Sequence, residues 1–432
     1  MNVCVFGLWH LGTVTAACLA GMGHSVVGLD FDPERVAELS QGTPPLFEPG
    51  LEDLLRAALA QGTLTVTRDA ATALRDAEAV WITIDTPVDE DDRADVESVI
   101  QAISRLFPHL RDRAVVLVSS QLPVGTTGRL EGMFSQAAKG RTVNFAYLPE
   151  NLRLGAAIDV FMRPDRLVAG VRGDRERARI LELLPSLADR MLWMSVESAE
   201  MTKHAINAFL ATSVTFINEI AAVCEQVGAD AAEVERGLKT DARIGPKGYL
   251  SPGGAFAGGT LARDVVYLGG LGGSLGVPVD LLAAVRSSND RHRAWPERRL
   301  TQSLGSVQGR TVAVWGLTYK PGTDTLRRSS AVALCTWLRA EGARVHAHDP
   351  AVRPSAPDVP SGIDLAASAL DAVDGADALV VATPWPEYRA VPAAQVRQRM
   401  AGTLVLDANR YLSATLGAEP GLRYVSVGRA VA

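Results

Sequence analysis

The feature that most constrains the fold is a glycine turn close to the start of the chain. Residues 7–12 read Gly-Leu-Trp-His-Leu-Gly, after a short apolar segment at 3–6 and before an apolar segment at 13–21. We expect these two segments to form a strand and a helix, followed by a second strand over 24–29 that ends at Asp30. Such a turn places backbone amides at the start of a helix, where they can hold the pyrophosphate of a dinucleotide.

Two side chains decide what this turn can bind. Asp30 follows Gly12 by 18 residues, at the end of the second strand, where a carboxylate can bind ribose hydroxyls and would repel the 2′-phosphate of NADP. The sequence therefore favours NAD. Trp9 stands where such turns usually carry their middle glycine, so its side chain must lie clear of the pyrophosphate. A purely structural strand–helix turn is the alternative interpretation.

The same pattern returns near the C-terminus. Further strands are expected at 79–84, 114–119, 311–317, 344–350 and 378–384. In both parts, Gly-Leu follows one strand, Asp follows the next, and Thr-Pro follows a later one. Continuous apolar strands separated by helices indicate parallel sheets that are covered on both faces. The predicted fold class is therefore α/β, with two Rossmann-like doubly wound parallel-sheet domains.

Between these two parts, apolar residues follow the three-and-four spacing of a helix. A long helix is expected over 198–227, then a Gly- and Pro-rich loop at 245–259 and a further helix from about Leu261. We therefore predict an N-terminal domain at 1–195, a central helical layer at 196–300 and a C-terminal domain at 301–432. Long central helices often form dimer interfaces, which favours a homodimer.

The central layer carries the polar residues of greatest chemical interest. Lys203 and Asn207 are four residues apart on the long helix and project from the same face, where a lysine and an amide could hold a developing oxyanion. From spacing alone, a solvated helix face is the alternative. Asp264 is interpreted either as a carboxylate at a helix N-terminus or as a base. His204 is expected to pack or to lie at the surface, and no metal site is expected.

Composition excludes several other classes of protein. The chain has 43 Lys and Arg against 49 Asp and Glu, for a net charge of −6, and only 6% aromatic residues, so nucleic acid is not an expected partner. The four cysteines are far apart and show no disulfide or metal spacing, which suggests a reducing compartment. Without a signal-peptide pattern or a continuous apolar run of about 20 residues, the expected location is the cytoplasm, with no membrane partner.

Several segments in order resemble the UDP-glucose/GDP-mannose dehydrogenase family of nucleotide-sugar 6-dehydrogenases. They are Val-Thr-Ala-Ala-Cys-Leu-Ala at 14–20, Phe-Glu-Pro-Gly-Leu at 47–51, Leu-Pro-Val-Gly-Thr at 122–126, Ala-Ile-Asn-Ala-Phe-Leu-Ala-Thr at 205–212, Arg-Ile-Gly-Pro-Lys at 243–247 and Lys-Pro-Gly-Thr-Asp at 320–324. The resemblance implies an NAD-binding domain, a helical dimerisation layer and a C-terminal domain that binds a UDP-sugar. Family members oxidise the C6 alcohol of the sugar to a carboxylate in two hydride transfers.

The resemblance also implies roles for individual residues. Positions that match contacts to NAD are Gly7, Trp9, Leu11, Gly12, Asp30, Arg35, Thr86, Gln121 and Arg327. Positions that match the catalytic set are Glu150 near the nicotinamide, Lys203 and Asn207 as the oxyanion-holding pair, Thr260, and Asp264 as the carboxylate that assists water or proton transfer. Positions that match contacts to the nucleotide sugar are Leu152, Tyr249, Leu250, Gly258, Lys320 and, from a partner subunit, Arg243.

Four positions depart from the family pattern at the cofactor and the reacting centre. The family's nucleophilic cysteine falls on Thr260, a family threonine falls on Gln121, a family glutamate falls on Leu154, and Trp9 replaces a glycine. A thiol reaches the thiolate easily and adds to an aldehyde, whereas a threonine hydroxyl is a far weaker acid. The covalent step that enables the second oxidation is therefore expected to be missing.

Three functions follow from these observations. The leading hypothesis is an NAD-dependent nucleotide-sugar oxidoreductase that performs one two-electron oxidation, giving an aldehyde or ketone sugar, or a redox-neutral reaction. The second is a full four-electron UDP-glucose 6-dehydrogenase, which similarity alone would assign. The third is a non-catalytic nucleotide-sugar-binding protein, which Trp9 would favour by blocking the pyrophosphate site.

Overall fold

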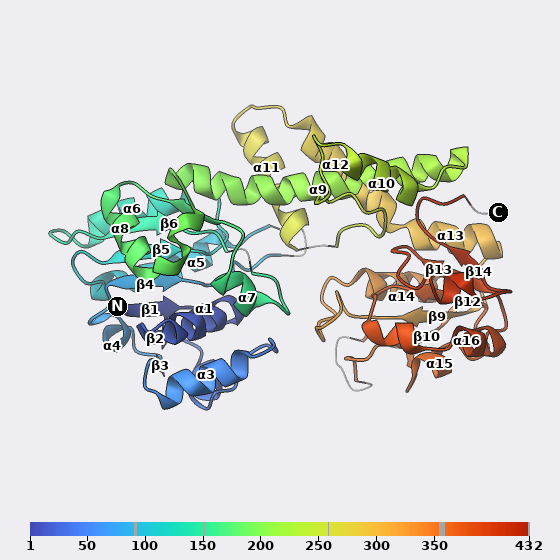
Figure 1. The fold of residues 1–432 in the computed structure, drawn as a ribbon, viewed down its shortest axis with the longest axis horizontal. Helices are drawn as coiled ribbons and strands as arrows, with labels where there is room; N and C mark the ends of the chain where they lie inside the picture. The colour runs from blue at the N-terminus through green and yellow to red at the C-terminus, as the bar shows by residue number, and fades with distance from the viewer. Residues whose placement is uncertain (90–92, 151, 258, 354–358, 431–432) are drawn as a thin grey trace. The chain divides into compact units, whose positions relative to one another are not determined.

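The chain folds into two compact units, Met1–Ala205 and Ile206–Ala432 (Figure 1). The computed structural model describes residues 1–89, 93–150, 152–257, 259–353 and 359–430. The long helix α9 (Val196–Val227) begins in the first unit and continues into the second. Gly258, which the family resemblance places at the nucleotide sugar, lies outside the described residues.

The first unit contains an eight-stranded sheet in the order β3-β2-β1-β4-β5-β6-β7-β8. Its pairs are parallel except for β6 with β7. The strands are β1 (Asn2–Phe6), β2 (Ser25–Leu29), β3 (Leu64–Thr67), β4 (Ala79–Ile82), β5 (Val115–Val118), β6 (Asn144–Tyr147), β7 (Leu167–Gly170) and β8 (Met191–Met194). The helices are α1 (His10–Gly21), α2 (Pro33–Ser40), α3 (Leu51–Ala60), α4 (Ala70–Leu74), α5 (Val96–Ser104), α6 (Thr126–Ala137), α7 (Ala157–Met162) and α8 (Asp174–Leu183), with short 3₁₀ helices at Phe107–His109 and Pro185–Arg190.

Strand β1 shows why this sheet is covered on both faces. Alternate residues of a strand point to opposite sides. Val3 and Val5 join the hydrophobic core that contains α1 and α3, whereas Cys4 and Phe6 join the core that contains α5 and α6. Strands β2 and β3 lie on one side of β1, and the chain then crosses to the other side of β1 to add β4 and the later strands. The ends of β1 and β4 therefore lie at the topological switch point, where such sheets bind ligands.

The second unit contains the helical layer and a six-stranded sheet in the order β11-β10-β9-β12-β13-β14, in which all pairs are parallel. The strands are β9 (Thr311–Trp315), β10 (Arg344–His348), β11 (Asp364–Leu365), β12 (Ala378–Val381), β13 (Leu404–Asp407) and β14 (Arg423–Val425). The helices after α9 are α10 (Ala231–Thr240), α11 (Thr260–Ser274), α12 (Asp280–Arg293), α13 (Trp295–Leu304), α14 (Ser330–Ala340), α15 (Ala369–Ala372) and α16 (Ala393–Arg399), with 3₁₀ helices at Pro386–Ala390 and Leu416–Ala418.

The predicted internal repeat is confirmed by hydrogen bonds as well as by strand order. In the first unit the Leu8 amide donates to Asp30 Oδ2 at 2.7 Å, and in the second the Leu317 amide donates to Asp349 Oδ2 at 2.7 Å. The first six strands of the first sheet and all six strands of the second also share the order 3-2-1-4-5-6, counted from the first strand of each unit. The prediction of two doubly wound α/β domains with a helical region between them in the chain is therefore confirmed, while the two predicted boundaries between the three domains stay predictions.

Helix α9 is long and apolar enough, by length and composition alone, to cross a membrane, and no other helix in the described ranges is. Buried core helices of soluble proteins meet the same criteria. About 44% of an 18-residue apolar stretch of α9 is buried inside the protein. The helix also carries Glu200, Lys203 and His204 in buried, hydrogen-bonded positions. Such polar contacts fit a helix that packs against its own chain.

Candidate functional site

The turn at residues 7–12 requires glycine at both ends. Gly7 has φ +96°, and a Cβ atom there would lie 2.8 Å from Ile84. A Cβ atom on Gly12 would lie 1.8 Å from the Gly7 carbonyl oxygen and 2.6 Å from Thr83 Oγ1. The backbone of the turn is therefore folded back on itself so closely that no other residue fits. Helix α1 starts at His10, three residues earlier than expected, and Trp9 is its N-cap.

The buried carboxylate of Asp30 organises the space beside this turn. It accepts hydrogen bonds from the backbone amides of Leu8 at 2.7 Å and Asp32 at 3.0 Å, and from Arg35 Nη1 at 3.0 Å. Arg35 also pairs with Asp32 at 3.3 Å. A carboxylate offers about four acceptor positions, so one remains for a ribose hydroxyl. Two carboxylates at this place oppose a 2′-phosphate, which agrees with the predicted preference for NAD.

Trp9 forms part of a cavity wall. Its indole is 40% exposed, and the Arg35 guanidinium carbon lies 5.1 Å from the ring centroid, a cation–π contact. The two side chains border a cavity of about 420 Å³. The other lining residues are Phe6, Gly7, Asp30, Phe31, Ile84, Asp85 and Ala102. The glycine cradle, the buried carboxylate and this cavity fit the pyrophosphate and adenosine of NAD. The alternative in which Trp9 blocks the pyrophosphate site gains no support from this geometry.

Glu150 and Lys203 are in direct contact. Lys203 Nζ donates to the Glu150 carbonyl oxygen at 2.6 Å and to Glu150 Oε1 at 3.2 Å, while the Leu152 amide donates to Glu150 Oε2 at 2.9 Å. Lys203 is 7% exposed, so it does not belong to a solvated helix face, and that alternative is wrong for this residue. On the neighbouring strand ends, Thr86 Oγ1 donates to the Gln121 carbonyl oxygen at 2.8 Å.

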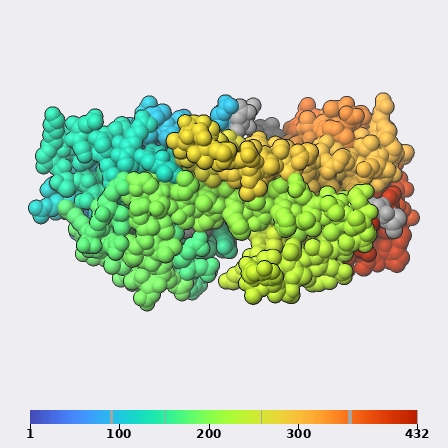
Figure 2. All heavy atoms as spheres, turned by 90° about the horizontal axis from the view of Figure 1, so that it is seen from above, coloured from blue at the N-terminus to red at the C-terminus, as the bar shows by residue number. Residues whose placement is uncertain are grey.

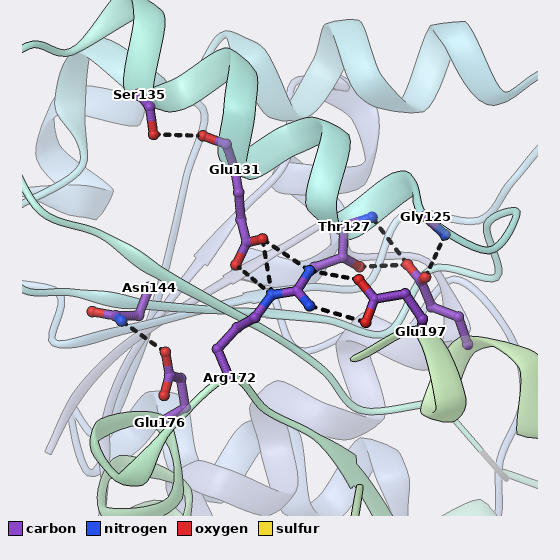
Figure 3. A network of polar contacts seen from close by, with 9 residues as sticks. Gly125, Thr127, Glu131, Ser135, Asn144, Arg172, Glu176 and Glu197 are labelled. Carbon is purple, nitrogen blue, oxygen red and sulfur yellow. Dashed lines mark hydrogen bonds and ion pairs between the residues drawn. The ribbon is translucent and has the colours of Figure 1, made fainter. Parts of the chain in front are cut away.

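Glu200 was not identified from the sequence, although it fixes the loop that follows Gln121. Its fully buried carboxylate accepts hydrogen bonds from the Gly125 amide at 2.6 Å, the Thr127 amide at 3.0 Å and Thr127 Oγ1 at 2.7 Å. Figure 3 shows Gly125 and Thr127 directed at this carboxylate at the start of α6. His204 Nε2 lies 2.9 Å from the Leu122 carbonyl oxygen. His204 is 3% exposed, so of the two alternatives expected for it, packing or the surface, packing is correct.

Arg172 adds a second connection between α6 and α9. Its guanidinium pairs with Glu197 at 2.7 Å and with Glu131 at 3.1 Å, as Figure 3 shows. The hydrogen bond to Glu197 raises the pKa of Arg172, and the same hydrogen bond lowers the pKa of Glu197. These contacts anchor the first turn of α9, the helix that carries Lys203 and Asn207.

In the second unit, Asn207 on α9 and Asp264 on α11 are in direct contact. Asn207 Nδ2 lies 2.5 Å from Asp264 Oδ2, and both side chains are buried. A solvated face is therefore wrong for Asn207 too. Asp264 lies beyond the first turn of α11, which contains no acidic residue, so its interpretation as an N-terminal helix carboxylate is wrong. Thr260 is the first residue of the same helix and is exposed.

The second unit has its own polar cavity of about 440 Å³ at the ends of β9 and β12. Among its lining residues are Tyr249, His292, Tyr319 and Lys320. Burial lowers the pKa of His292, and burial raises the pKa of Tyr319. Of the predicted substrate contacts, Tyr249 and Lys320 line the cavity, and the buried Leu250 is adjacent to Tyr249 in the chain.

Three asparagines that the sequence did not identify shape the loop before α11. Asn218 Oδ1 accepts from the Gly253 amide at 3.0 Å, Asn409 Oδ1 accepts from the Gly254 amide at 2.9 Å, and Asn289 Oδ1 accepts from the Phe256 amide at 3.0 Å. Each side chain comes from a segment distant in sequence. Because the loop borders the cavity, these side chains fix part of its wall.

Arg243 and Arg327 are among the predicted residues that line neither cavity. Arg243 is exposed and pairs with Asp241 at 2.7 Å, and this hydrogen bond raises its pKa. Its predicted role in a partner subunit stays a prediction. Arg327 is exposed in the segment between β9 and α14, and its predicted contact with NAD also stays a prediction.

A Rossmann unit with a glycine cradle, followed in the chain by helices and a second Rossmann unit with its own cavity, is the arrangement expected of a nicotinamide-dependent dehydrogenase with a separate substrate-binding domain. Three family models of the UDP-glucose/GDP-mannose dehydrogenase family match the chain: the NAD binding domain at 1–187, the central domain at 197–291 and the UDP binding domain at 313–414. The chain belongs to this family and is an NAD-dependent nucleotide-sugar dehydrogenase.

Relatives and solved structures agree with this assignment over nearly the full length. A UDP-glucose 6-dehydrogenase of Pseudomonas aeruginosa is 37% identical over 99% of this chain and 98% of its own, and one of Rhizobium meliloti is 36% identical over 99% and 100%. The structure of a UDP-glucose dehydrogenase from Pyrobaculum islandicum has a TM-score of 0.85 at 31% identity, covering 99% of this chain and 94% of that chain. A UDP-D-ManNAc dehydrogenase from Pyrococcus horikoshii has a TM-score of 0.87 at 25% identity, covering 100% of both chains.

Proposed function

We propose that this dehydrogenase oxidises an alcohol carbon of a UDP-sugar and stops after one hydride transfer, or returns the hydride in a redox-neutral reaction. The observation that carries the proposal is Thr260, four residues before Asp264 on α11, at the position of the family's nucleophilic cysteine. The UDP binding domain of the family supports a UDP-sugar, and the relatives are named for UDP-glucose. UDP-glucose is therefore the first substrate to test.

The cysteines of the chain offer no replacement for the missing thiol. Cys224 lies on α9, 17 residues after Asn207, which places it about 25 Å farther along the helix at 1.5 Å per residue. Cys4, Cys18 and Cys335 are buried in hydrophobic cores. Burial raises the pKa of Cys18 and of Cys335 to about 12, so neither forms a thiolate near neutral pH. A second oxidation requires a thiohemiacetal that holds the aldehyde, and none of these four cysteines supplies the thiol for it.

The remaining residues suit the first oxidation. Lys203 and Asn207 present an ammonium and an amide N–H group one turn apart on α9, both able to stabilise an alkoxide. Asp264, in contact with Asn207, accepts the proton that leaves the alcohol. NAD, when bound in the cavity beside Asp30, supplies the hydride acceptor. The alcohol loses a proton to Asp264 and a hydride to NAD, and this two-electron oxidation converts the H–C–OH group to C=O.

The test is to restore the thiol. Thr260→Cys, alone and combined with Gln121→Thr and Leu154→Glu, is compared with Thr260→Ser, which keeps a hydroxyl. We expect the wild type and Thr260→Ser to yield one NADH or none per sugar and the cysteine variants to yield up to two. If every cysteine variant keeps the wild-type stoichiometry, Thr260 is not the limiting group. The full UDP-glucose 6-dehydrogenase, which the names of the relatives favour, predicts two NADH for the wild type.

The proposal includes a homodimer in the cytoplasm. Phe209, Phe216 and Val223 are spaced by seven residues on α9 and are 69%, 46% and 58% exposed, and Val227 continues this apolar stripe. Figure 2 shows α9 uncovered along one face of the molecule. A stripe of this kind is suited to a second copy of the same helix. Size-exclusion chromatography with light scattering should give a dimer for the wild type and a monomer for Phe209→Glu/Phe216→Glu; a monomeric wild type would contradict this part of the proposal.

A further inference from the structure

The Phe-Glu-Pro-Gly-Leu segment at 47–51 has no role in the chemistry described above, yet it contains one of the most deeply buried carboxylates of the first unit. Glu48 is 3% exposed. It does not cap the helix that follows it, because Gly50 is the N-cap of α3. The Glu48 side chain instead contacts residues that are distant in sequence. Its burial therefore calls for an explanation outside its own segment.

Glu48 binds two segments at once. Its Oε1 accepts a hydrogen bond from the Ala157 amide at 2.8 Å, and its Oε2 accepts one from the Gly155 amide at 2.8 Å. The same Oε2 lies 3.1 Å from His10 Nε2. His10 is the first residue of α1 and directly follows Trp9 in the glycine turn. The Glu48 carboxylate thus connects the glycine turn at 7–12 with the residues that lead into α7.

The segment joined to Glu48 is held at its other end by a residue of the proposed catalytic set. Lys203 Nζ contacts both the carbonyl oxygen and the carboxylate of Glu150, and the Leu152 amide donates to the same carboxylate. Leu152 is the residue of this segment that the family resemblance assigns to the nucleotide sugar. The position of the described residues 152–157 therefore depends on Lys203 at one end and on Glu48 at the other.

We propose that Glu48 and His10 are positioning residues that couple the cofactor turn to the segment at 152–157. Occupation of the turn fixes the start of α1 and with it His10, and the His10–Glu48 contact then holds the Gly155 and Ala157 amides in place. A buried carboxylate that loses one of its three partners is costly, so the three contacts form together. The assignment of this segment to the nucleotide sugar rests on the proposed function, whereas the coupling itself does not.

Hydrogen–deuterium exchange at the Gly155 and Ala157 amides tests the coupling without any sugar. We compare the full-length wild type, Glu48→Gln and His10→Ala, each with and without saturating NAD. The matched controls are Glu52→Gln, an exposed glutamate in the first turn of α3, and His109→Ala, an exposed histidine of the same unit. We expect NAD to slow exchange at both amides in the wild type and in both controls by about threefold or more.

The two variants distinguish the contribution of the Glu48 carboxylate from that of His10. Glu48→Gln should speed exchange at both amides by about tenfold without NAD, since a charged acceptor is lost. His10→Ala should weaken the basal protection less than Glu48→Gln does, because the carboxylate remains, and should lose the effect of NAD on these amides while still binding NAD. An equal effect of NAD in His10→Ala and the wild type would overturn the proposal, as would a wild type in which NAD leaves both amides unchanged. Should Glu48→Gln not fold, the His10→Ala comparison alone decides.

Kinetics supply a second readout that a merely structural role would not produce. With a UDP-sugar that the wild type converts, His10→Ala should raise the KM for the sugar about tenfold and change kcat less than twofold. A fall in kcat at constant KM would contradict the positioning role. If the wild type converts no UDP-sugar, the proposed function fails, and the exchange experiment still stands.

Discussion

Replacing Lys203 by methionine tests the proposed chemistry most specifically. Methionine keeps the length and packing of the side chain but removes the ammonium group. In the folded protein, the group is buried and bonded to Glu150 O at 2.6 Å and Glu150 Oε1 at 3.2 Å. Loss of one preorganised oxyanion donor costs about 3–4 kcal/mol in the transition state, which is roughly a 10²–10³-fold loss of kcat. The lost contacts to Glu150 cost about 1–3 kcal/mol of stability.

The assay is steady-state NADH formation, with thermal unfolding measured in parallel. We expect kcat to fall by at least 10²-fold while the KM for NAD changes less than threefold. Tm should drop by about 3–10 °C. Lys139→Met, at an exposed position of the same unit, is the control and should match the wild type. A Lys203→Met variant that keeps more than a third of the wild-type kcat, at a temperature where it is folded, would refute the role of this ammonium group.

Three further predictions concern the cofactor cavity, stability and pH. NAD should quench tryptophan fluorescence saturably, and the signal should disappear in Trp9→Phe and weaken in Asp30→Ala; no binding at millimolar NAD would favour a non-catalytic protein. Glu200→Ala leaves three donors, two of them buried, without their carboxylate and should lower the free energy of unfolding by about 3 kcal/mol in urea, against less than 1 kcal/mol for an exposed glutamate. Because burial lowers the pKa of His292, the unfolded chain binds more protons below pH 6.5. Stability should therefore fall as the pH drops below 6.5, and the fall should be shallower in His292→Gln; an unchanged slope would contradict this reasoning.

The parts that could be predicted from the sequence are those encoded in neighbouring residues. The glycine turn, the strands that end in Asp30 and Asp349 and the long helix α9 depend on local patterns, and the structure confirms them within a few residues. The helix predicted from about Leu261 starts at Thr260, in agreement with the sequence pattern.

The parts that could not be predicted depend on contacts between distant residues. Glu48 meets the Ala157 amide across 109 residues, and Glu200 meets Thr127 across 73. The sequence around a glutamate does not indicate a distant hydrogen-bond partner, so neither glutamate could be distinguished from an ordinary charged residue. The same holds for Asn207 and Asp264. Their burial excludes a solvated face only once α9 and α11 are seen to be in contact, and the start of α11 at Thr260 excludes Asp264 as an N-terminal helix carboxylate.

The most direct test of the central claim is the number of NADH molecules formed per sugar consumed. Purified protein is incubated with UDP-glucose, other UDP-sugars and GDP-sugars in excess NAD, and the products are identified by mass spectrometry. The account predicts one NADH with an aldehyde or ketone sugar, or no net NADH with an altered sugar. Two NADH and a uronic acid would contradict it, because a chain with Thr260 in place of the thiol would then complete both oxidations.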